Sequence, residues 1–90
     1  MSGNLSRPLL VRHARLRWDD RRGQHQLVFP EGMLVLNESG AAIVRLCDGR
    51  TVAELVAALS QSFSDVPLAG DVTVFLDRLA QKGLLRDANT

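Results

Sequence analysis

Side chains able to perform acid–base, nucleophilic or metal chemistry are few in this chain. It contains two histidines, His13 and His25, and a single cysteine, Cys47. A catalytic or metal site would need them to converge with one another or with a carboxylate. The local patterns instead predict two polar strand residues at the solvent face and a small hydrophobic residue on a helix. Asp19 and Asp20 are adjacent carboxylates, but a hairpin loop gives them no enclosure in which one could act as an acid and the other as a base.

Sequence motifs of catalysis are also missing. The chain has no phosphate-binding glycine loop, no nucleophile elbow and no zinc-ligand spacing. A chain of 90 residues buries only about two-thirds of its unfolded surface, which leaves few apolar residues for a substrate pocket. The sequence therefore favours a binding module over an enzyme, with no cofactor and no metal.

Cysteine content and hydropathy indicate the compartment. A single cysteine excludes an internal disulfide and a cysteine-cluster zinc site, and a lone thiol fits a reducing environment. The first residues lack the apolar stretch of a signal peptide, and no run approaches the ~20 apolar residues of a membrane span. We therefore expect a cytoplasmic domain with no membrane partner.

Charge is distributed unevenly, although the formal net charge is only +1. Residues 1–30 hold six arginines against two aspartates, whereas residues 31–90 hold five cations against eight carboxylates. A basic first strand followed by three helices also fits a winged-helix nucleic-acid-binding domain, which is the alternative function. The predicted middle helices carry mostly acidic and apolar residues, so side chains able to read bases are scarce. We therefore expect no nucleic-acid partner.

Three extended segments are predicted before the first helix. Residues 11–18 alternate in polarity, and residues 24–29 do so again with Leu27 and Phe29 facing the core. Residues 33–36 are apolar on both faces. Together the segments predict an antiparallel β-meander. In the first strand, the core side would be Ala14, Leu16 and Trp18, and the outer side His13, Arg15 and Arg17.

Two helices with clear local signals follow the meander. Asn37 is a predicted N-cap, and Gly49 has the left-handed tolerance that suits the position just past the end of this first helix. Thr51 and Glu54 have the spacing of a capping box at the start of the second helix. The first helix would bury Ala42, Ile43, Leu46 and Cys47.

A third helix is predicted at residues 71–82, after a loop at 64–70 and before Gly83. One flank of it combines apolar and basic side chains, because residues four apart share a helix face. Such a flank would suit an acidic side chain of a bound peptide. The flank consists of Val74, Arg78 and Lys82 beside Phe75.

The third strand presents an unprotected edge. The first and third strands of a meander are both edges, and the first carries outward charges whereas residues 33–36 carry none. Such an edge is covered by the chain's own helices or a second copy, or it is kept open for an extended peptide. Alternation leaves open whether Met33 and Val35 or Leu34 and Leu36 face the helices.

Six short motifs, in register, are similar to those of one known family. They are Arg-Leu-Arg-Trp-Asp at 15–19, Pro-Glu-Gly at 30–32, Leu-Asn at 36–37, Asp-Gly-Arg-Thr-Val at 48–52, Asp-Val with Phe-Leu within 71–76, and Gly-Leu-Leu at 83–85. Over about residues 8–85 the chain resembles the coenzyme PQQ synthesis protein D (PqqD) family. That family is the prototype of the recognition elements for ribosomally made, post-translationally modified peptides (RiPPs). Residues 1–7 would be a flexible extension and residues 8–90 a single domain.

The resemblance implies an α+β, winged-helix-like domain with a three-stranded antiparallel β-meander followed by three α-helices. It implies a non-catalytic chaperone that binds the precursor peptide PqqA and presents it to PqqE, the radical S-adenosylmethionine enzyme of pyrroloquinoline quinone (PQQ) biosynthesis. In related recognition elements the peptide pairs with strand three and packs on helix three. Carried over, the peptide-binding residues are Met33, Leu34, Val35, Leu36, Val74, Phe75, Arg78, Leu79 and Lys82.

Two further interactions are considered. The basic hairpin could dock on the enzyme or steer an acidic peptide, and a homodimer could form through the open strand edge. The candidate docking residues are Arg15, Arg17, Arg21 and Arg22.

Overall fold

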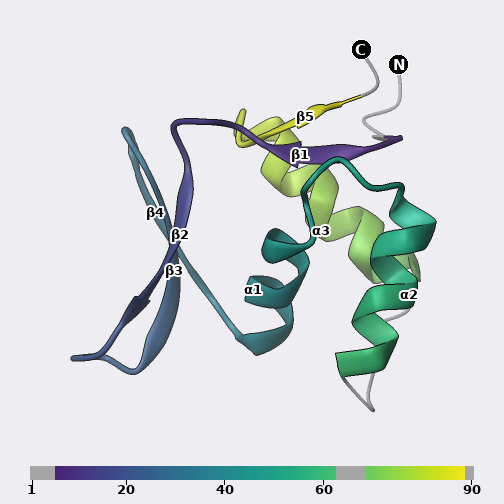
Figure 1. Cartoon of the computed structure of the whole chain (residues 1–90). Helices are drawn as coiled ribbons and strands as arrows, with labels where there is room; N and C mark the ends of the chain where they lie inside the picture. The colour runs from purple at the N-terminus through teal and green to yellow at the C-terminus, as the bar shows by residue number, and fades with distance from the viewer. Residues whose placement is uncertain (1–5, 63–68, 89–90) are drawn as a thin grey trace.

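The computed structural model describes residues 6–62 and 69–88, which form two small antiparallel sheets and three helices (Figure 1). The predicted α+β class, with a three-stranded meander followed by three helices, is confirmed. The elements are β1 (Pro8–Leu10), β2 (Arg15–Asp19), β3 (Gln24–Phe29), β4 (Gly32–Leu36), α1 (Glu38–Arg45), α2 (Val52–Ser62), α3 (Ala69–Gln81) and β5 (Leu85–Asp87).

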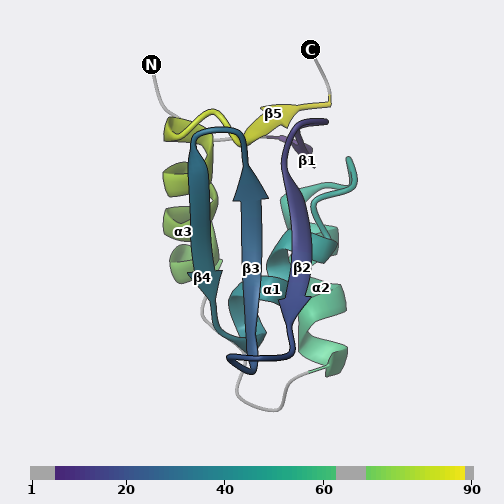
Figure 2. The same ribbon diagram turned by 90° about the vertical axis from the view of Figure 1, so that its left-hand side faces the viewer.

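The larger sheet has the order β2-β3-β4, with β3 in the centre (Figure 2). Its register pairs Leu16 of β2 with Leu27 of β3, and Leu27 with Leu34 of β4. Directly opposite residues point to the same face of a sheet, so these leucines form one apolar row on the helix side. Leu27 is fully buried there, as predicted.

Trp18 lies on the predicted side of the sheet, but its side chain is 49% exposed and contributes little to the core. It pairs with His25 near the end of β2, and the two rings meet edge to face with centroids 4.7 Å apart. The tryptophan therefore covers His25 more than it contributes to the core.

The first strand starts later than predicted. Residues 11–14 form a turn in which the Ala14 amide donates to the Val11 carbonyl at 3.2 Å, and only from Arg15 does the chain pair with β3. His13 therefore lies in a turn rather than on a strand. The break occurs because the segment before the turn belongs to a different sheet.

That second sheet joins the two ends of the chain. β1 pairs antiparallel with β5, so that Pro8 is opposite Asp87 and Leu10 is opposite Leu85. The Asp87 carboxylate also accepts hydrogen bonds from the Ser6 and Arg7 amides, each at 3.1 Å. Residues 1–5 of the expected flexible extension lie outside the described residues.

Helix α1 starts where predicted and ends earlier. The Asn37 side chain accepts a hydrogen bond from the Gly40 amide at 2.7 Å, which confirms the N-cap. The last helical residue is Arg45, with Leu46 as C-cap, so Cys47 and Gly49 lie beyond the helix. Gly49 has a positive φ of 98°, but in a linker that pairs with β1 rather than at the C′ position.

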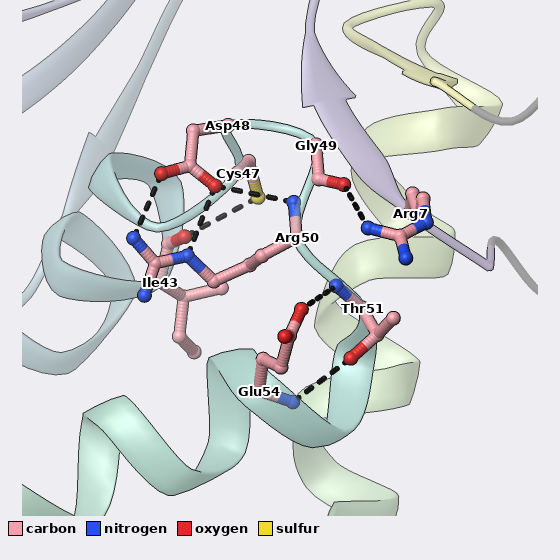
Figure 3. Close-up of polar contacts among 8 residues, drawn as sticks. All are labelled: Arg7, Ile43, Cys47, Asp48, Gly49, Arg50, Thr51 and Glu54. Carbon is pink, nitrogen blue, oxygen red and sulfur yellow. Dashed lines mark hydrogen bonds and ion pairs between the residues drawn. The ribbon is translucent and has the colours of Figure 1, made fainter.

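The linker from α1 to α2 is fixed by short polar contacts (Figure 3). Arg50 donates to both carboxylate oxygens of Asp48, from Nε at 2.9 Å and from Nη2 at 2.7 Å. These hydrogen bonds lower the pKa of Asp48 to about 2.

The predicted capping box at the start of α2 is confirmed. The Thr51 amide donates to Glu54 Oε1 at 2.8 Å, and the Glu54 amide donates to Thr51 Oγ1 at 3.1 Å.

Helix α3 begins at Ala69, two residues before the predicted start. Of the loop expected at 64–70, residues 64–68 lie outside the described residues, and residues 69 and 70 belong to the helix. Its end is a Schellman motif at Gly83. The Gly83 amide donates to the Ala80 carbonyl and the Leu84 amide donates to the Leu79 carbonyl, both at 2.9 Å. Gly83 has the positive φ that this motif requires, 76°.

Candidate functional site

Strand β4 is an edge strand. Among the described residues it pairs only with β3, and its other edge faces α3 (Figure 2). On an edge strand every second residue directs its amide and carbonyl away from the sheet. The edge that the sequence left as an open question is therefore not closed by another strand within residues 6–62 and 69–88.

The register settles which side chains of β4 face the helices. Leu34 pairs with Leu27 and Leu36 pairs with His25, both on the core side. Met33 and Val35 point to the opposite face and are 43% and 57% exposed. Leu34 and Leu36 are thus the side chains of β4 that line its inner surface.

A groove runs between β4 and α3. One hollow in it, of about 200 Å³, has an apolar floor and a basic rim. Seven of the nine residues predicted for peptide binding line this hollow: Leu34, Val35, Leu36, Phe75, Arg78, Leu79 and Lys82.

The two other predicted residues do not line the hollow. Met33 lies on the far face of the sheet, and Val74 is 54% exposed on α3. Val74 is outside because the core-facing side of α3 is occupied by Val72, Leu76 and Leu79, and the groove meets the helix along Phe75, Arg78 and Lys82.

The rim of the groove is cationic. Arg78 lies in the last turn of α3 and Lys82 is the first residue after the helix, where its amide donates to the Arg78 carbonyl at 3.2 Å. Both residues are exposed. Within the part of the chain that the structure describes, no carboxylate makes an ion pair with either of them. They are therefore free to interact with an anionic group that enters the groove.

Sequence reasoning missed a second and larger hollow of about 470 Å³, which continues the groove past the end of β4. It shares Val35, Leu36 and Phe75 with the first hollow and reaches the start of α1 at Ser39 and Gly40. A side chain at Gly40 would reach within 3.1 Å of Asn37 Oδ1 and 3.5 Å of the Phe75 ring, so glycine keeps this end open. No local pattern predicts this junction, because three elements meet only in the folded chain.

The four candidate docking arginines separate into two pairs. Arg15 and Arg17 are exposed on the outer face of β2, as alternation predicted. Arg21 and Arg22 lie in the turn after β2, where their backbone amides donate to Asp19 Oδ1 at 3.0 and 3.3 Å. The strand register therefore places only Arg15 and Arg17 on the outer face of the sheet.

His25 is not at the solvent face, contrary to the prediction. It is 8% exposed on the core side, and its Nε2 lies 2.9 Å from Glu38 Oε2 at the start of α1. The carboxylate is the partner of Nε2 and ties β3 to α1, whereas Nδ1 is buried with no hydrogen-bond partner among the described residues. No group of three or more potential metal ligands occurs in the described part of the chain.

The hydropathy of the helices gives one further result. Over residues 6–62 and 69–88, no helix combines the length and the apolar character needed to cross a bilayer.

Comparison with known proteins identifies the family. The sequence model described as Coenzyme PQQ synthesis protein D (PqqD) matches residues 24–85. The chain belongs to the PqqD family. The matched span runs from the first residue of β3 to the first residue of β5, so it includes both walls of the groove, β4 and α3.

Relatives with a PqqD-like sequence are similar over most of their length. A PqqA binding protein of Rhodopseudomonas palustris (strain TIE-1) is 40% identical over 86 residues, covering 92% of this chain and 84% of that protein. A PqqA binding protein of Pseudomonas aeruginosa (strain UCBPP-PA14) is 42% identical over 72 residues, 78% of each chain.

A solved structure shows the same fold. The solution structure of the PqqD truncation of Methylobacterium extorquens PqqCD, described as a functional and stand-alone RiPP recognition element, superimposes with a TM-score of 0.75 at 34% identity. The alignment covers 96% of this chain and 99% of that one.

Proposed function

We propose that this chain binds the precursor peptide PqqA by adding it as a strand to β4 and presents it to the radical S-adenosylmethionine enzyme PqqE. The observation that carries the proposal is the edge of β4, which no described strand pairs, beside a groove with an apolar floor. Membership of the PqqD family and relatives named PqqA binding protein support the choice of peptide.

Main-chain pairing and side-chain packing have separate roles in this mode of binding. An added strand satisfies the outward amides and carbonyls of β4, which supplies affinity with little dependence on sequence. Side chains of the peptide that point to the helix side enter the groove beside Leu34, Leu36 and Phe75. Arg78 and Lys82 favour an acidic peptide side chain at the basic end of the groove.

The proposed role requires no catalytic residue in this chain. A free precursor peptide is disordered, and its ordering as a strand costs affinity but fixes the register in which it is presented. Simultaneous contact with the enzyme then raises the effective concentration of the peptide at the active site. The chain acts as an adaptor, and a cytoplasmic location remains an expectation from its single cysteine.

Substitution of Val35 tests strand addition from the side of this chain. Proline removes one amide of β4 and fixes φ, whereas threonine keeps the strand. We expect Val35→Pro to weaken PqqA binding at least about tenfold and Val35→Thr to change it by less than about threefold. Amide-shift titration with the PqqA peptide provides the affinities, and circular dichroism shows whether each variant folds. A folded Val35→Pro protein with unchanged affinity would contradict strand addition.

Modification of the peptide tests the same mechanism without perturbing the fold. Methylation of one backbone nitrogen at a time removes single donors from PqqA. A strand pairs through alternate residues, so we expect alternate methyl groups to abolish binding and the intervening ones to be tolerated. Loss of affinity with no alternation would mean that the peptide does not bind as a strand.

A homodimer through β4 is the competing occupant of the same edge. Two copies that pair by this edge would exclude the peptide, so added PqqA should convert dimer to monomer in light scattering. A dimer that persists in saturating peptide would place the self-association elsewhere.

A further inference from the structure

The outer face of the three-stranded sheet is uncovered. Helices α1, α2 and α3 all lie on the opposite side, and no described element crosses the outer face (Figures 1 and 2). The register places two rows across it, listed from β2 to β4: Arg15, Val28, Met33 and Arg17, Gln26, Val35.

This outer face carries two arginines on β2 and apolar side chains on β4. Asp19, at the end of β2, lies on the same face, where its carboxylate accepts a hydrogen bond from Gln26 Nε2 at 3.0 Å. Arg15 and Arg17 on β2 are exposed, and none of the described carboxylates forms an ion pair with either. On β4, Met33 and Val35 are 43% and 57% exposed. Methionine and arginine are enriched in protein interfaces, and adjacent exposed apolar side chains mark binding surfaces.

We propose that the outer face docks the enzyme that modifies the peptide, through an enzyme surface that is acidic opposite β2 and apolar opposite β4. The proposal rests on the proposed function, since it assumes that PqqA is bound at β4. Charge complementarity with the unpaired arginines selects an acidic protein surface.

The bound peptide would continue this face. A strand added to β4 has the same pleat, so every second peptide side chain points outward beside Met33 and Val35. The side chains in between point into the groove. The groove of this chain and the enzyme would thus read alternate residues of the same peptide.

The outer face and the bound peptide together form one surface for the enzyme, so binding of the peptide and binding of the enzyme are coupled. The enzyme gains contacts with the outward side chains of the peptide, so it should bind the peptide-loaded chain more tightly than the free chain. Thermodynamic linkage then requires that the enzyme raise the affinity of the chain for the peptide by the same factor.

Charge reversal on the face provides the test, with a matched control on the adjacent turn. Arg15→Glu/Arg17→Glu and Arg21→Glu/Arg22→Glu change the net charge equally, but only the first pair lies in the strand rows that lead across the outer face to β4. Arg21 and Arg22 lie in the turn after β2. We expect the first variant to bind PqqE about tenfold or more weakly at low salt and the second to bind within about twofold of the wild type. Both should bind PqqA with unchanged affinity.

The outcomes distinguish this inference from the proposed function. A wild-type chain that does not bind PqqA contradicts the proposed function. Normal PqqA binding with unchanged PqqE binding by the Arg15/Arg17 variant, or with equal loss in both variants, overturns the docking face. So does an Arg15/Arg17-dependent self-association or duplex DNA binding in place of enzyme binding. Neutral Arg15→Gln/Arg17→Gln gives the same comparison if the reversed charges disturb folding.

Discussion

At the scale of single residues, the environment decides whether a reactive side chain can react. Cys47 is 4% exposed, and its thiol donates to the Ile43 carbonyl at 3.2 Å (Figure 3). Burial, with a smaller contribution from the Asp48 charge, raises the pKa of this thiol to about 12. Sequence analysis correctly treated Cys47 as a buried small residue, since a thiol without nearby cations is not activated.

The Cys47 thiol should react only when the chain unfolds, and its ionisation should make stability depend on pH. The unfolded thiol ionises near pH 9.0 and the folded thiol near 12, so between these values the unfolded state loses its proton first and unfolding is favoured. The free energy of unfolding should therefore fall as the pH rises through this window. Iodoacetamide labelling and urea titrations at several alkaline pH values measure both effects.

Cys47→Ala is the control for this pH dependence. The chain has no tyrosine and a single lysine, Lys82, so few other groups titrate in the same range. The variant should lose most of the alkaline decline. A decline equal to that of the wild type would mean that Cys47 is not its cause.

His25 shows what polarity alone predicts wrongly. Alternation places it on the same side as Leu27 and Phe29, but its polarity suggested the solvent face. In the folded chain its buried Nε2 has a partner in the carboxylate of Glu38, which comes thirteen residues later and lies 2.9 Å away. A contact between two elements cannot be found from the pattern of one strand.

At the scale of elements, signals confined to a few residues were read correctly. The N-cap at Asn37, the capping box at Thr51 and Glu54, and the stop at Gly83 all act through hydrogen bonds between near neighbours. The orientation of β4 could not be read, because both of its faces are apolar. Only pairing with β3 determines that Leu34 and Leu36 point inward.

Gly83 offers a test of the element scale. Its φ of 76° is in the left-handed region, and a Cβ there would meet nothing within 4 Å, so the cost of a side chain is conformational. Gly83→Ala should lower the free energy of unfolding by about 1–2 kcal/mol. Asparagine tolerates this φ better, so Gly83→Asn should cost less. Chemical denaturation measures both, and an equal loss for the two variants would argue against a backbone origin.

At the scale of the whole molecule, the parts that depend on distant contacts were not predictable. The groove was outlined because β4 and α3 each carry a readable pattern, but its larger hollow requires α1, β4 and α3 together. The β1–β5 pair joins two three-residue strands from opposite ends of the sequence. Strands so short have no periodicity of their own, so the sequence pattern predicts neither β1 nor β5.

That terminal pair has a mechanical consequence. Because Pro8 is opposite Asp87, tension applied through the two ends of the chain would enter the fold at one end of the ribbon. The backbone hydrogen bonds between β1 and β5 would then break one after another, because the force acts on one residue pair at a time and not on all pairs together. The larger sheet, with the peptide edge of β4, lies away from this point of entry (Figure 1). Pulling from the ends would therefore open the terminal ribbon before it disturbs the surface that binds the peptide.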